Sequence, residues 1–291
     1  TSLEGSPIVP VSAVGEPGVA TLLAALETLA ADVSPRAADD VFRMPVDRSF
    51  TVRGTGTVVT GTIWSGTAKV GDVMHLAPAD QSARIRRIHA VGEEVEEAVA
   101  GTRAALALAG IEKAQAPRGS TVTNLGWWQA TTRFTARIRT LAGAAPLVPD
   151  QRVRVHVGTA EVMARIHPFG PDVGTGMTPV WGEVRLEGPA LVRGGDRFVL
   201  RSYSPVTTIG GGTVLEPFPP PRRMRSTEPS ELRGAFGSPE ERRRHALSVA
   251  AHKGLTPTEL AVWVGNPVTT SQLEIAEGSG QVIRAGERVY S

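Results

Sequence analysis

Short β-rich runs separated by glycine-containing turns fill the chain from Val41 to about Asn124, and this pattern constrains the fold most. The runs are FTVRG, TVVTGTIW, DVMHLAP, ARIRRIHAVG and RAALALAG, with turns at Gly66 and Gly71-Asp72. Short strands at this regular spacing are typical of an antiparallel barrel. We therefore expect a first β-barrel domain over residues 41–126.

A second β-rich segment runs from about Thr131 to Pro217. In RVRVHVG, the valines at 153, 155 and 157 alternate with Arg152, Arg154 and His156, which indicates a strand with one buried and one solvated face. The runs DRFVLRSY and TIGGGTVLEP close this segment. The expected fold class is therefore mainly β, with two consecutive antiparallel β-barrels, the second over residues 130–217.

The two ends of the chain follow other patterns. Residues 19–31, VATLLAALETLAA, predict one helix, and residues 7–11 before it predict a short buried strand. This strand and helix, residues 1–35, form a fragment without partners of its own, and residues 32–40 have the composition of a linker.

At the other end, PFPPPRR is a stiff linker, and the C-terminal domain is expected over residues 222–291. Three short helices are predicted, the first over 239–252 with Ser238 as its cap, the second capped by Thr256, and the third within TTSQLEIAEG. A hairpin with Ala285-Gly286 at its turn follows, and this order describes an α+β winged helix.

Length and composition limit the class of protein. A chain of 291 residues predicts two or three domains, and no window approaches 18 consecutive apolar residues, so no membrane partner is expected. The first residues lack the basic segment of a secretory signal, and Thr1 suggests a truncated chain. With no cysteine there are no disulfides or thiolate metal sites, which is compatible with a cytoplasmic location.

Motif searches argue against an enzyme. The glycines of GTGTVVTG continue as strand, whereas a dinucleotide fingerprint needs a helix after its glycines. No GxxxxGK[ST] loop, HExxH or GxSxG motif occurs, and the six histidines lack paired ligand spacing. We expect no catalytic residue, no metal site and no cofactor in this chain.

Arginine is the dominant cation, with 28 Arg against 3 Lys, although the net charge is only +2. The planar guanidinium suits phosphates, so nucleic acid is a reasonable partner. An Arg-rich, Lys-poor composition also follows from a GC-rich genome, and composition alone does not separate the two explanations.

Several segments carry a resemblance to a known family. FRMPVDRSFTVRGTGTVVTGTIWSGTAKVGD and EEVEEAVAGTRAALALAGIEKAQAPRGSTV resemble domain II of the translational GTPases, and within them the selenocysteine-specific elongation factors (SelB). VRVHVGTAEVMARI and GDRFVLRSYSPVTTIGGGTVLEP are similar to domain III of that family. SAVGEPGVATLLAAL is similar to the closing strand and helix of the GTPase domain.

The resemblance implies a function for the whole factor. It implies binding of selenocysteinyl-tRNA and its GTP-dependent delivery to the ribosome at recoded UGA codons, with GTP and Mg²⁺ bound upstream of Thr1. It also implies an mRNA hairpin as partner, bound by further winged helices beyond Ser291.

The resemblance further implies an aminoacyl pocket in the first barrel. In elongation factor Tu the matching pocket has an acidic pair and an Asn, and here Asp47 keeps one acid while Arg48 and Arg103 replace the others. Because a selenol is more acidic than a thiol, whose pKa is about 8.5, two guanidinium groups would select an anionic selenocysteine over serine or cysteine. Asp47 would bind the amino group, and Phe50 would line the site or stack on the terminal adenosine. The alternatives are a surface ion pair at Asp47-Arg48 and core packing at Phe50.

Arginines of the second barrel are candidates for contacts with tRNA phosphates, although solvated strand faces are the alternative. They are Arg152, Arg154, Arg165, Arg197 and Arg201. Two further clusters, Arg222–Arg225 and Arg242–Arg244, are either RNA contacts or solvated charge runs.

Two rival functions remain open from the sequence. The GTPase subunit of a sulfate adenylyltransferase carries similar barrels but needs neither paired pocket arginines nor a winged helix. A transcription regulator would use residues 239–291 on duplex DNA.

Overall fold

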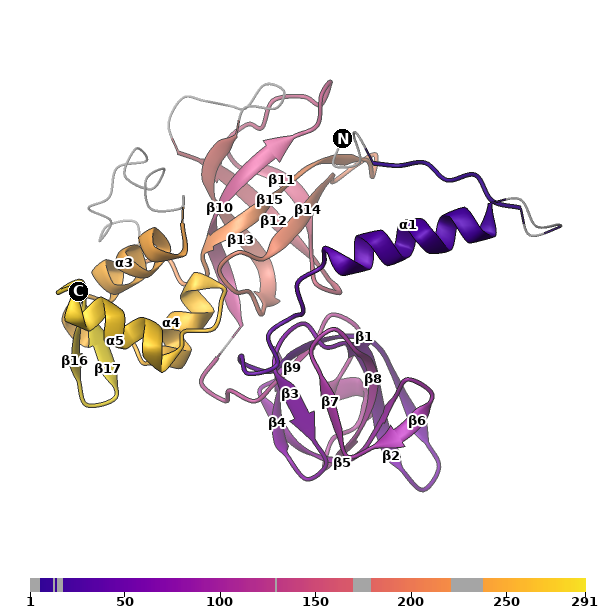
Figure 1. Cartoon of the computed structure of the whole chain (residues 1–291). Coiled ribbons are helices and arrows are strands. Elements are labelled where there is room, and N and C mark those ends of the chain that lie inside the picture. Colours follow the sequence, from indigo (N-terminus) through magenta and orange to yellow (C-terminus); the bar gives the residue numbers. More distant parts are fainter. Residues whose placement is uncertain (1–5, 13, 15–17, 129, 170–178, 221–237) are drawn as a thin grey trace. The chain divides into compact units, whose positions relative to one another are not determined.

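The computed structural model describes residues 6–12, 14, 18–128, 130–169, 179–220 and 238–291. It divides into two compact units, residues 1–36 and 37–291 (Figure 1). The first unit contains helix α1, Val19–Ala31, as predicted, and none of its side chains is buried.

The predicted strand at residues 7–11 is wrong: these residues form no strand, and Ile8 is 93% exposed. A strand needs a neighbour for its hydrogen bonds, and the described part of this unit contains no other strand.

The first barrel follows in the second unit. Its strands are β1 Arg43–Val52, β2 Gly56–Thr62, β3 Thr67–Lys69, β4 Val73–Ala77, β5 Gln81–Ala90, β6 Glu93–Val95, β7 Glu97–Val99, β8 Arg103–Ala109 and β9 Thr121–Thr123. In the order β4-β9-β1-β2-β8-β5, six strands close a ring, because β4 also pairs with β5. Strand β6 extends this sheet, β3 pairs with β7, and a short helix η1, Lys113–Gln115, lies between β8 and β9.

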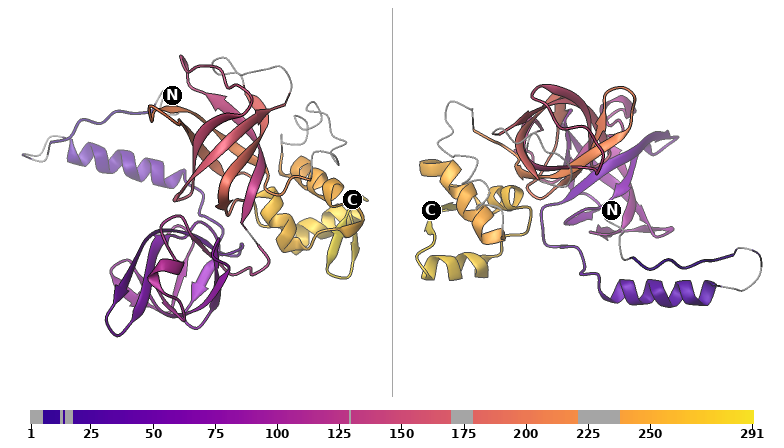
Figure 2. Two further views of the ribbon diagram at one scale, coloured as in Figure 1. Left: turned by 180° about the vertical axis from the view of Figure 1, so that it is seen from behind. Right: turned by 90° about the horizontal axis from the view of Figure 1, so that it is seen from above.

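The second barrel is a closed ring of six strands. Figures 1 and 2 show this barrel from three sides. Its strands are β10 Thr131–Thr140, β11 Gln151–Val157, β12 Ala160–Pro168, β13 Val180–Ala190, β14 Arg197–Ser202 and β15 Thr208–Glu216, in the order β10-β13-β12-β11-β14-β15. The predicted alternation of β11 is confirmed, since its three valines are at most 4% exposed. The mainly β fold class, with two consecutive barrels, is therefore confirmed.

The run of three glycines in β15 is explained by close approach of the neighbouring strands. A Cβ atom on Gly211 would lie 2.6 Å from the carbonyl oxygen of Phe198, and one on Gly210 would lie 2.3 Å from that of Arg139. Gly212 lies against the ring of Phe198, which packs edge to face on Phe134 at 5.4 Å between centroids. Any larger residue at these positions would push β15 out of the barrel.

The C-terminal segment contains three helices and a hairpin. The elements are α3 Pro239–Ala250, η3 Ala251–Lys253, α4 Pro257–Val264, α5 Thr270–Gly278, β16 Ile283–Ala285 and β17 Arg288–Tyr290. Ser238 and Thr256 are confirmed as helix caps, each within a reciprocal capping box. The predicted hairpin turn is one residue too early: Ala285 pairs with Arg288, so the turn is Gly286-Glu287.

Two reciprocal Arg–Asp pairs join the barrels. Arg43 of β1 donates both terminal nitrogens to Asp196, which precedes β14, at 2.7 and 2.6 Å. Arg193, just before Asp196, donates to Asp40, just before the first barrel, at 2.6 and 2.8 Å. All four side chains are at most 7% exposed. Each barrel segment thus supplies one cation and one anion to a buried junction, which we call the Arg–Asp junction.

The Arg–Asp junction is also packed with aromatic and apolar side chains. The Arg43 guanidinium lies 4.8 Å from the ring centroid of Trp64 and 5.6 Å from that of Trp128. Trp128 is 2% exposed and donates to the Val192 carbonyl, so it packs at the junction of the barrels, whereas Trp127 is 43% exposed. Trp128 belongs to a cluster of buried apolar side chains, separate from the two barrel cores, that also includes Val41, Leu191 and Val262.

We expect Asp196→Ala to lower the free energy of unfolding by about 3–5 kcal/mol, because it leaves the buried Arg43 cation without its partner. Urea denaturation followed by tryptophan fluorescence measures this loss. The matched control is the double variant Arg43→Met/Asp196→Leu, which removes both charges and should recover most of the stability. An Asp196→Ala loss below about 1 kcal/mol would contradict a buried, unscreened pair.

Candidate functional site

A β-bulge in β1 positions the acidic residue of the predicted pocket. Val46 lies opposite Gly61 and Arg48 lies opposite Thr60, so Asp47 is an extra residue without a partner in β2. Gly61 is required here, because a Cβ atom would lie 2.2 Å from the carbonyl oxygen of Pro45. The bulge therefore directs the Asp47 side chain along the sheet toward the neighbouring strands.

The Asp47 carboxylate bonds to two strands at once. It accepts from the Thr60 hydroxyl of β2 at 2.7 Å, and from both terminal nitrogens of Arg103 of β8 at 2.5 and 3.1 Å. Arg103 remains 54% exposed, whereas Asp47 is 21% exposed. The structure thus brings together two of the four predicted pocket residues in a fork-to-fork pair whose guanidinium faces solvent.

The charges around Asp47 shift its pKa. The hydrogen bond from Arg103 lowers the pKa of the Asp47 carboxyl most, and the Thr60 bond and the positive charges of Arg103 and Arg48 add to this effect, while partial burial opposes it. The same pair raises the pKa of Arg103. Asp47 is therefore an anion, and Arg103 and Arg48 are the two cations that act on it.

Two separate hollows open beside these residues. The first, which we call the Arg103 hollow, has a volume of about 620 Å³ and is lined by Thr60, residues 89–92 and residues 101–105. The second, the Phe50 hollow, has a volume of about 1060 Å³ and is lined by residues 48–51, 56–57, 111–114 and 117–118. The structure does not place Arg48 and Phe50 in the Arg103 hollow; they line the Phe50 hollow instead.

The Phe50 hollow contains cations that the sequence analysis did not identify. Lys113 and Arg118 line it together with Arg48, and Glu112 is its one acid. The Phe50 ring is 40% exposed, so part of its face is open to the hollow. Lys113 begins the short helix η1 and Arg118 lies between η1 and β9, and no sequence motif indicates that these two residues fold back beside β1.

The predicted phosphate contacts of the second barrel include a row of aligned arginines. In the strand register, Arg133 of β10 lies opposite Arg185 of β13, Arg185 opposite Arg165 of β12, and Arg165 opposite Arg152 of β11. We call these four residues the arginine row; with strands about 4.8 Å apart it spans about 14 Å. Like charges directly opposite each other destabilise a sheet, so the row requires compensating anions.

Only part of that compensation comes from carboxylates. Arg152 is paired with Glu187 at 2.6 Å and Arg185 with Glu183 at 2.6 Å. Arg165 and Arg133 donate instead to the backbone carbonyls of Asp150 and Pro219. The arginine row thus combines four guanidinium groups with two carboxylates. The sequence did not predict Arg133 and Arg185 as members, because their alignment depends on the register between strands.

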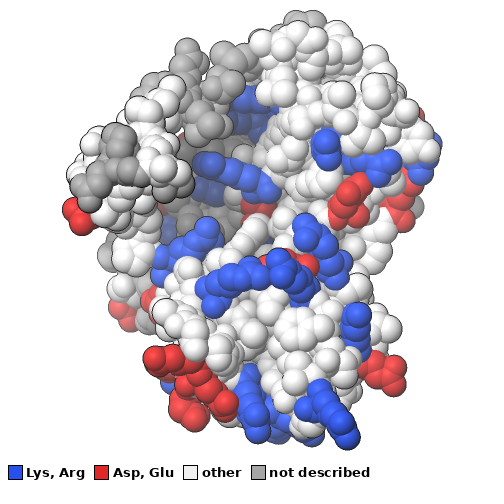
Figure 3. Space-filling model, turned by 90° about the vertical axis from the view of Figure 1, so that its right-hand side faces the viewer, with Lys and Arg blue, Asp and Glu red and all other residues white. Residues whose placement is uncertain are grey.

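The other predicted arginines occupy neighbouring positions. Arg154 lies opposite Arg201, forms an ion pair with Glu161 at 2.6 Å and lies over the Tyr203 ring, as does Arg152. Arg197 is exposed on β14, opposite Thr213. Figure 3 shows Lys and Arg side chains gathered across the middle of one face, with Asp and Glu side chains beside them.

The remaining predicted cations contribute less to a site. Arg222, Arg223 and Arg225 lie outside the described residues. Arg242 donates to the Val264 carbonyl and is partly buried, and this burial lowers its pKa. Arg242 therefore holds α3 against α4 rather than facing a ligand.

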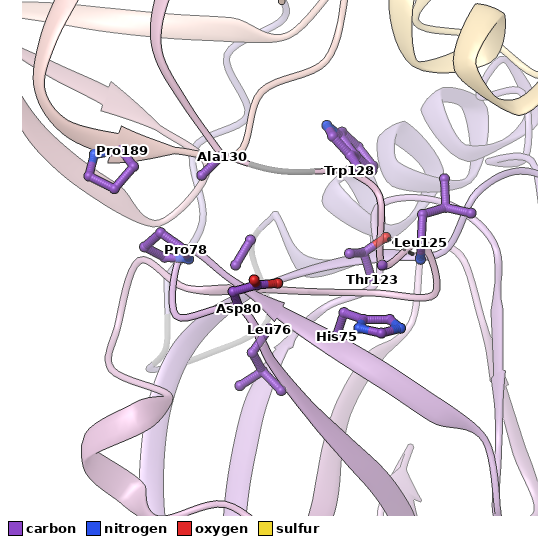
Figure 4. Close-up of a pocket in the computed structure, with 11 residues that line it drawn as sticks. His75, Leu76, Pro78, Asp80, Thr123, Leu125, Trp128, Ala130 and Pro189 are labelled. Atoms are coloured by element: carbon purple, nitrogen blue, oxygen red, sulfur yellow. Dashed lines mark hydrogen bonds between the residues drawn. The ribbon is translucent and has the colours of Figure 1, made fainter.

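A third cavity, of about 180 Å³, adjoins the Arg–Asp junction (Figure 4). Its labelled lining includes Trp128, Leu125 and Pro189, with His75 and Asp80 as its titratable groups. His75 is engaged with the Ser82 hydroxyl at 3.1 Å. The cavity contains none of the predicted site residues, and we interpret it as a packing gap between the barrels.

The described residues hold neither a cluster of metal-binding side chains nor a membrane-spanning helix. They contain no group of three or more His, Asp or Glu side chains arranged to hold a metal ion. Within the same residues, no helix has the length and apolar character needed to cross a membrane.

We expect the Asp47–Arg103 pair to contribute stability that depends on pH. Because the folded-state pKa of Asp47 is depressed, its contribution is present above the unfolded value of about 3.9 and is lost as the pH falls through the folded value. At pH 7, Asp47→Asn should cost at most about 1 kcal/mol, since Arg103 is half exposed. Thermal melts between pH 2 and pH 7 measure the difference, which should vanish at the acid end. In an Arg103→Gln background the pH-dependent difference should be largely absent; its persistence there would show that Arg103 is not the cause.

Comparison with known proteins identifies both barrels. The family model of elongation factor Tu domain 2 matches residues 56–123, and the model of the β-barrel domain of selenocysteine-specific elongation factors matches residues 127–221. The selenocysteine-specific elongation factor of Desulfomicrobium baculatum is 34% identical over 265 residues, 89% of this chain and 41% of that protein. That of Escherichia coli is 35% identical over 191 residues, 64% of this chain and 29% of that protein.

Solved structures agree with these matches. A crystal structure of a bacterial selenocysteine-specific elongation factor covers 99% of this chain with a TM-score of 0.77 at 23% identity, which shows the fold. The translation elongation factor SelB of Methanococcus maripaludis covers 70% of it with a TM-score of 0.61 at 29% identity. The chain spans less than half of the length of each of these relatives. The second barrel therefore belongs to the family of β-barrel domains of selenocysteine-specific elongation factors, and the first barrel belongs to the family of elongation factor Tu domain 2.

Proposed function

We propose that this chain is the part of a translation elongation factor that binds selenocysteinyl-tRNA for GTP-dependent delivery to the ribosome at recoded UGA codons. The observation that supports this most is the Asp47–Arg103 pair, held at a β-bulge with its guanidinium facing solvent beside a hollow of about 620 Å³. The relatives that match the chain are selenocysteine-specific elongation factors, which supports the same cargo.

Charge is the proposed basis of cargo selection. A selenol is more acidic than a thiol, whose pKa is about 8.5, so the selenocysteine side chain is an anion at neutral pH while serine is neutral. Arg103 donates two of its five N–H groups to Asp47, so three remain for a ligand. Arg48 acts on the same carboxylate and supplies a second positive charge, so an anion arriving here meets a net positive field.

Asp47 also has capacity left for the amino group of the cargo. A carboxylate offers about four acceptor positions, and Asp47 uses three of them on Thr60 and Arg103. A charge-assisted bond from the ammonium group of the esterified amino acid would occupy the fourth. Asp47 would thereby bind the amino group of the cargo and also hold the Arg103 guanidinium that recognises the cargo side chain.

The Phe50 hollow suits the terminal nucleotides of the acceptor arm. The exposed part of the Phe50 ring offers a stacking surface for a base, which contributes about 1–3 kcal/mol. Arg48, Lys113 and Arg118 line the same hollow and would meet the adjoining phosphates. Arg48 follows Asp47 directly in β1 and lines the Phe50 hollow. The bulge in β1 therefore places the aminoacyl site next to the proposed nucleotide site.

We assign the arginine row to the backbone of the tRNA stem. Double-stranded RNA is recognised mainly by shape and phosphate contacts, and the row presents cations about one strand spacing apart along about 14 Å. Arg154 and Arg201 extend the positive surface to β14. The excess of guanidinium over carboxylate groups in the row supports an anionic partner.

The other functions of the family belong, in this proposal, to the whole factor. Residues 1–35 would be the closing part of a GTPase domain that binds GTP and Mg²⁺, and residues 222–291 would be the first winged helix. Contacts with the ribosome and with an mRNA hairpin are assigned to the complete protein in the cytoplasm. No step of this proposal requires a catalytic residue in this chain.

The third C-terminal helix argues against a DNA-binding regulator. In helix-turn-helix proteins the recognition helix lies in the major groove and contacts bases and phosphates. Helix α5 contains Glu274 and Glu277 and neither Lys nor Arg, so it would be repelled by the DNA backbone. Any retardation of a DNA duplex by the full chain in a gel shift should therefore be unchanged by substitutions in α5.

We expect Arg103→Ala to weaken binding of selenocysteinyl-tRNA about tenfold or more, and binding of seryl-tRNA on the same tRNA much less. The reason is that a charge-assisted contact contributes about 1.5–3 kcal/mol, of which 1.4 kcal/mol corresponds to tenfold. Arg48→Ala should weaken binding of both charged forms, because Arg48 lines the Phe50 hollow. Filter binding with the two charged forms measures the ratio. Arg86→Ala is the matched control, since Arg86 is exposed on β5 of the same barrel and lines neither hollow. Equal losses for the two charged forms in Arg103→Ala would remove the charge-selection mechanism.

We expect Arg165→Ala to weaken tRNA binding whatever amino acid is attached, because Arg165 occupies an inner position of the arginine row. Each lost phosphate contact should reduce the slope of log affinity against log salt by about one. The control is Arg139→Ala, on β10 of the same barrel and opposite Gly211 rather than in the row. A salt slope that is the same in the two variants would contradict the assignment.

A further inference from the structure

The turn between β5 and β6 holds a residue in a conformation that does not suit it. Ala90 pairs with Glu93, so Val91 and Gly92 form a two-residue hairpin turn. Both have positive φ angles, 54° for Val91 and 87° for Gly92. Such a turn favours Asn-Gly or Asp-Gly, because a β-branched residue is strained at positive φ.

Val91 is exceptional in two ways. Among the described residues, the other non-glycine positions with positive φ are Asp80, Asp150 and Ala251, so Val91 is the one β-branched side chain in this group. It is also 90% exposed, so its apolar surface gains nothing from burial in the barrel. Neither backbone preference nor core packing accounts for a valine here. Strained residues of this kind cluster at ligand sites, so Val91 is a candidate for a ligand contact.

The turn forms one wall of the Arg103 hollow. Residues 89–92 line one part of it and residues 101–105, including Arg103, line another. The hollow thus combines an exposed apolar side chain at its rim with a guanidinium group that is fixed by Asp47. A ligand bound there would meet an anion-binding group and an apolar surface together.

Charge attraction alone would not select selenocysteine among acidic cargoes, since an aspartyl side chain is also an anion at neutral pH. The two anions differ in how strongly they hold water. A carboxylate pays a large desolvation penalty beside an apolar surface unless all its acceptor positions are satisfied. A selenolate is large, polarizable and weakly hydrated, and sulfur-like atoms pack well against apolar groups.

We propose that Val91 is a specificity-determining residue of the aminoacyl site, which excludes water from the Arg103 hollow and thereby rejects carboxylate cargo in favour of selenocysteine. This inference rests on the proposed function of the hollow. Arg103 attracts an anion. Because Val91 excludes water from the hollow, only an anion that loses its hydration shell at low cost can contact Arg103. The strain of the turn persists because Asn or Asp, which fit the turn, would bring a polar group into the hollow.

The test compares variants of the full chain with one tRNA charged with selenocysteine, aspartate or serine. Val91→Asn keeps the turn and replaces the apolar surface by a polar one, and Val91→Ala removes apolar surface while keeping a positive-φ residue that is not glycine. Val73→Asn is the matched control, because Val73 is an exposed valine of the same barrel that does not line the hollow. Filter binding gives the affinities, and thermal melts report the strain.

We expect Val91→Asn to raise the melting temperature and to lower the selenocysteine-to-aspartate affinity ratio about tenfold, with Val91→Ala lowering the ratio without the gain in melting temperature. Val73→Asn should leave the ratio unchanged. If Val91→Asn and Val91→Ala both change the ratio less than twofold, Val91 is only a tolerated turn residue and the inference is wrong. If the unmodified chain does not prefer selenocysteinyl-tRNA over seryl-tRNA, the proposed function itself fails, and this inference fails with it.

Discussion

The loop between β13 and β14 is the point on which the arrangement of residues 37–291 depends. Arg193 and Asp196 of this loop form the Arg–Asp junction with Asp40 and Arg43, and the same Arg193 donates to the Ala261 carbonyl of α4. Gly194 completes the attachment by donating its backbone N–H to the Val262 carbonyl. Buried charges are tolerated only when each has a partner, so the two barrels must meet at this loop for the ion pairs to form, and the same loop carries the contacts with α4.

The candidate site depends on a second, smaller constraint, which is the single extra residue in β1. In a regular strand, residues 47 and 48 would point to opposite faces of the sheet; the bulge instead leaves Asp47 between Thr60 and Arg103 while Arg48 faces the Phe50 hollow. One inserted residue thus places a carboxylate between two cations that serve different hollows. Loss of the bulge would reverse the faces and separate Asp47 from Arg103.

The sequence predicts those features that local patterns control. The alternation in β11 and the caps Ser238 and Thr256 are readable because strand period and capping chemistry are local. The strand predicted at residues 7–11 failed because strand formation needs partners that a local pattern does not reveal. The arginine row was only partly visible: Arg165 and Arg152 belong to successive strands, whereas Arg133 and Arg185 join them through the register of a closed barrel. The separation of the two hollows follows from the bulge, which no composition or period indicates.

The geometry also bears on why the chain uses Arg rather than Lys. In Arg103 and Arg152, two nitrogens of the guanidinium donate to one carboxylate, and the rest of the group stays exposed. The ammonium group of a Lys cannot donate in this way, because it has no planar pair of donors. The intramolecular carboxylate holds the side chain in one orientation before any ligand arrives, so less conformational entropy is lost on binding. It also reduces the net charge, which limits repulsion between neighbouring arginines on adjacent strands. A GC-rich genome would account for the abundance of arginine, but it does not explain why Arg103 and Arg152 are each paired with a carboxylate and still partly exposed to solvent.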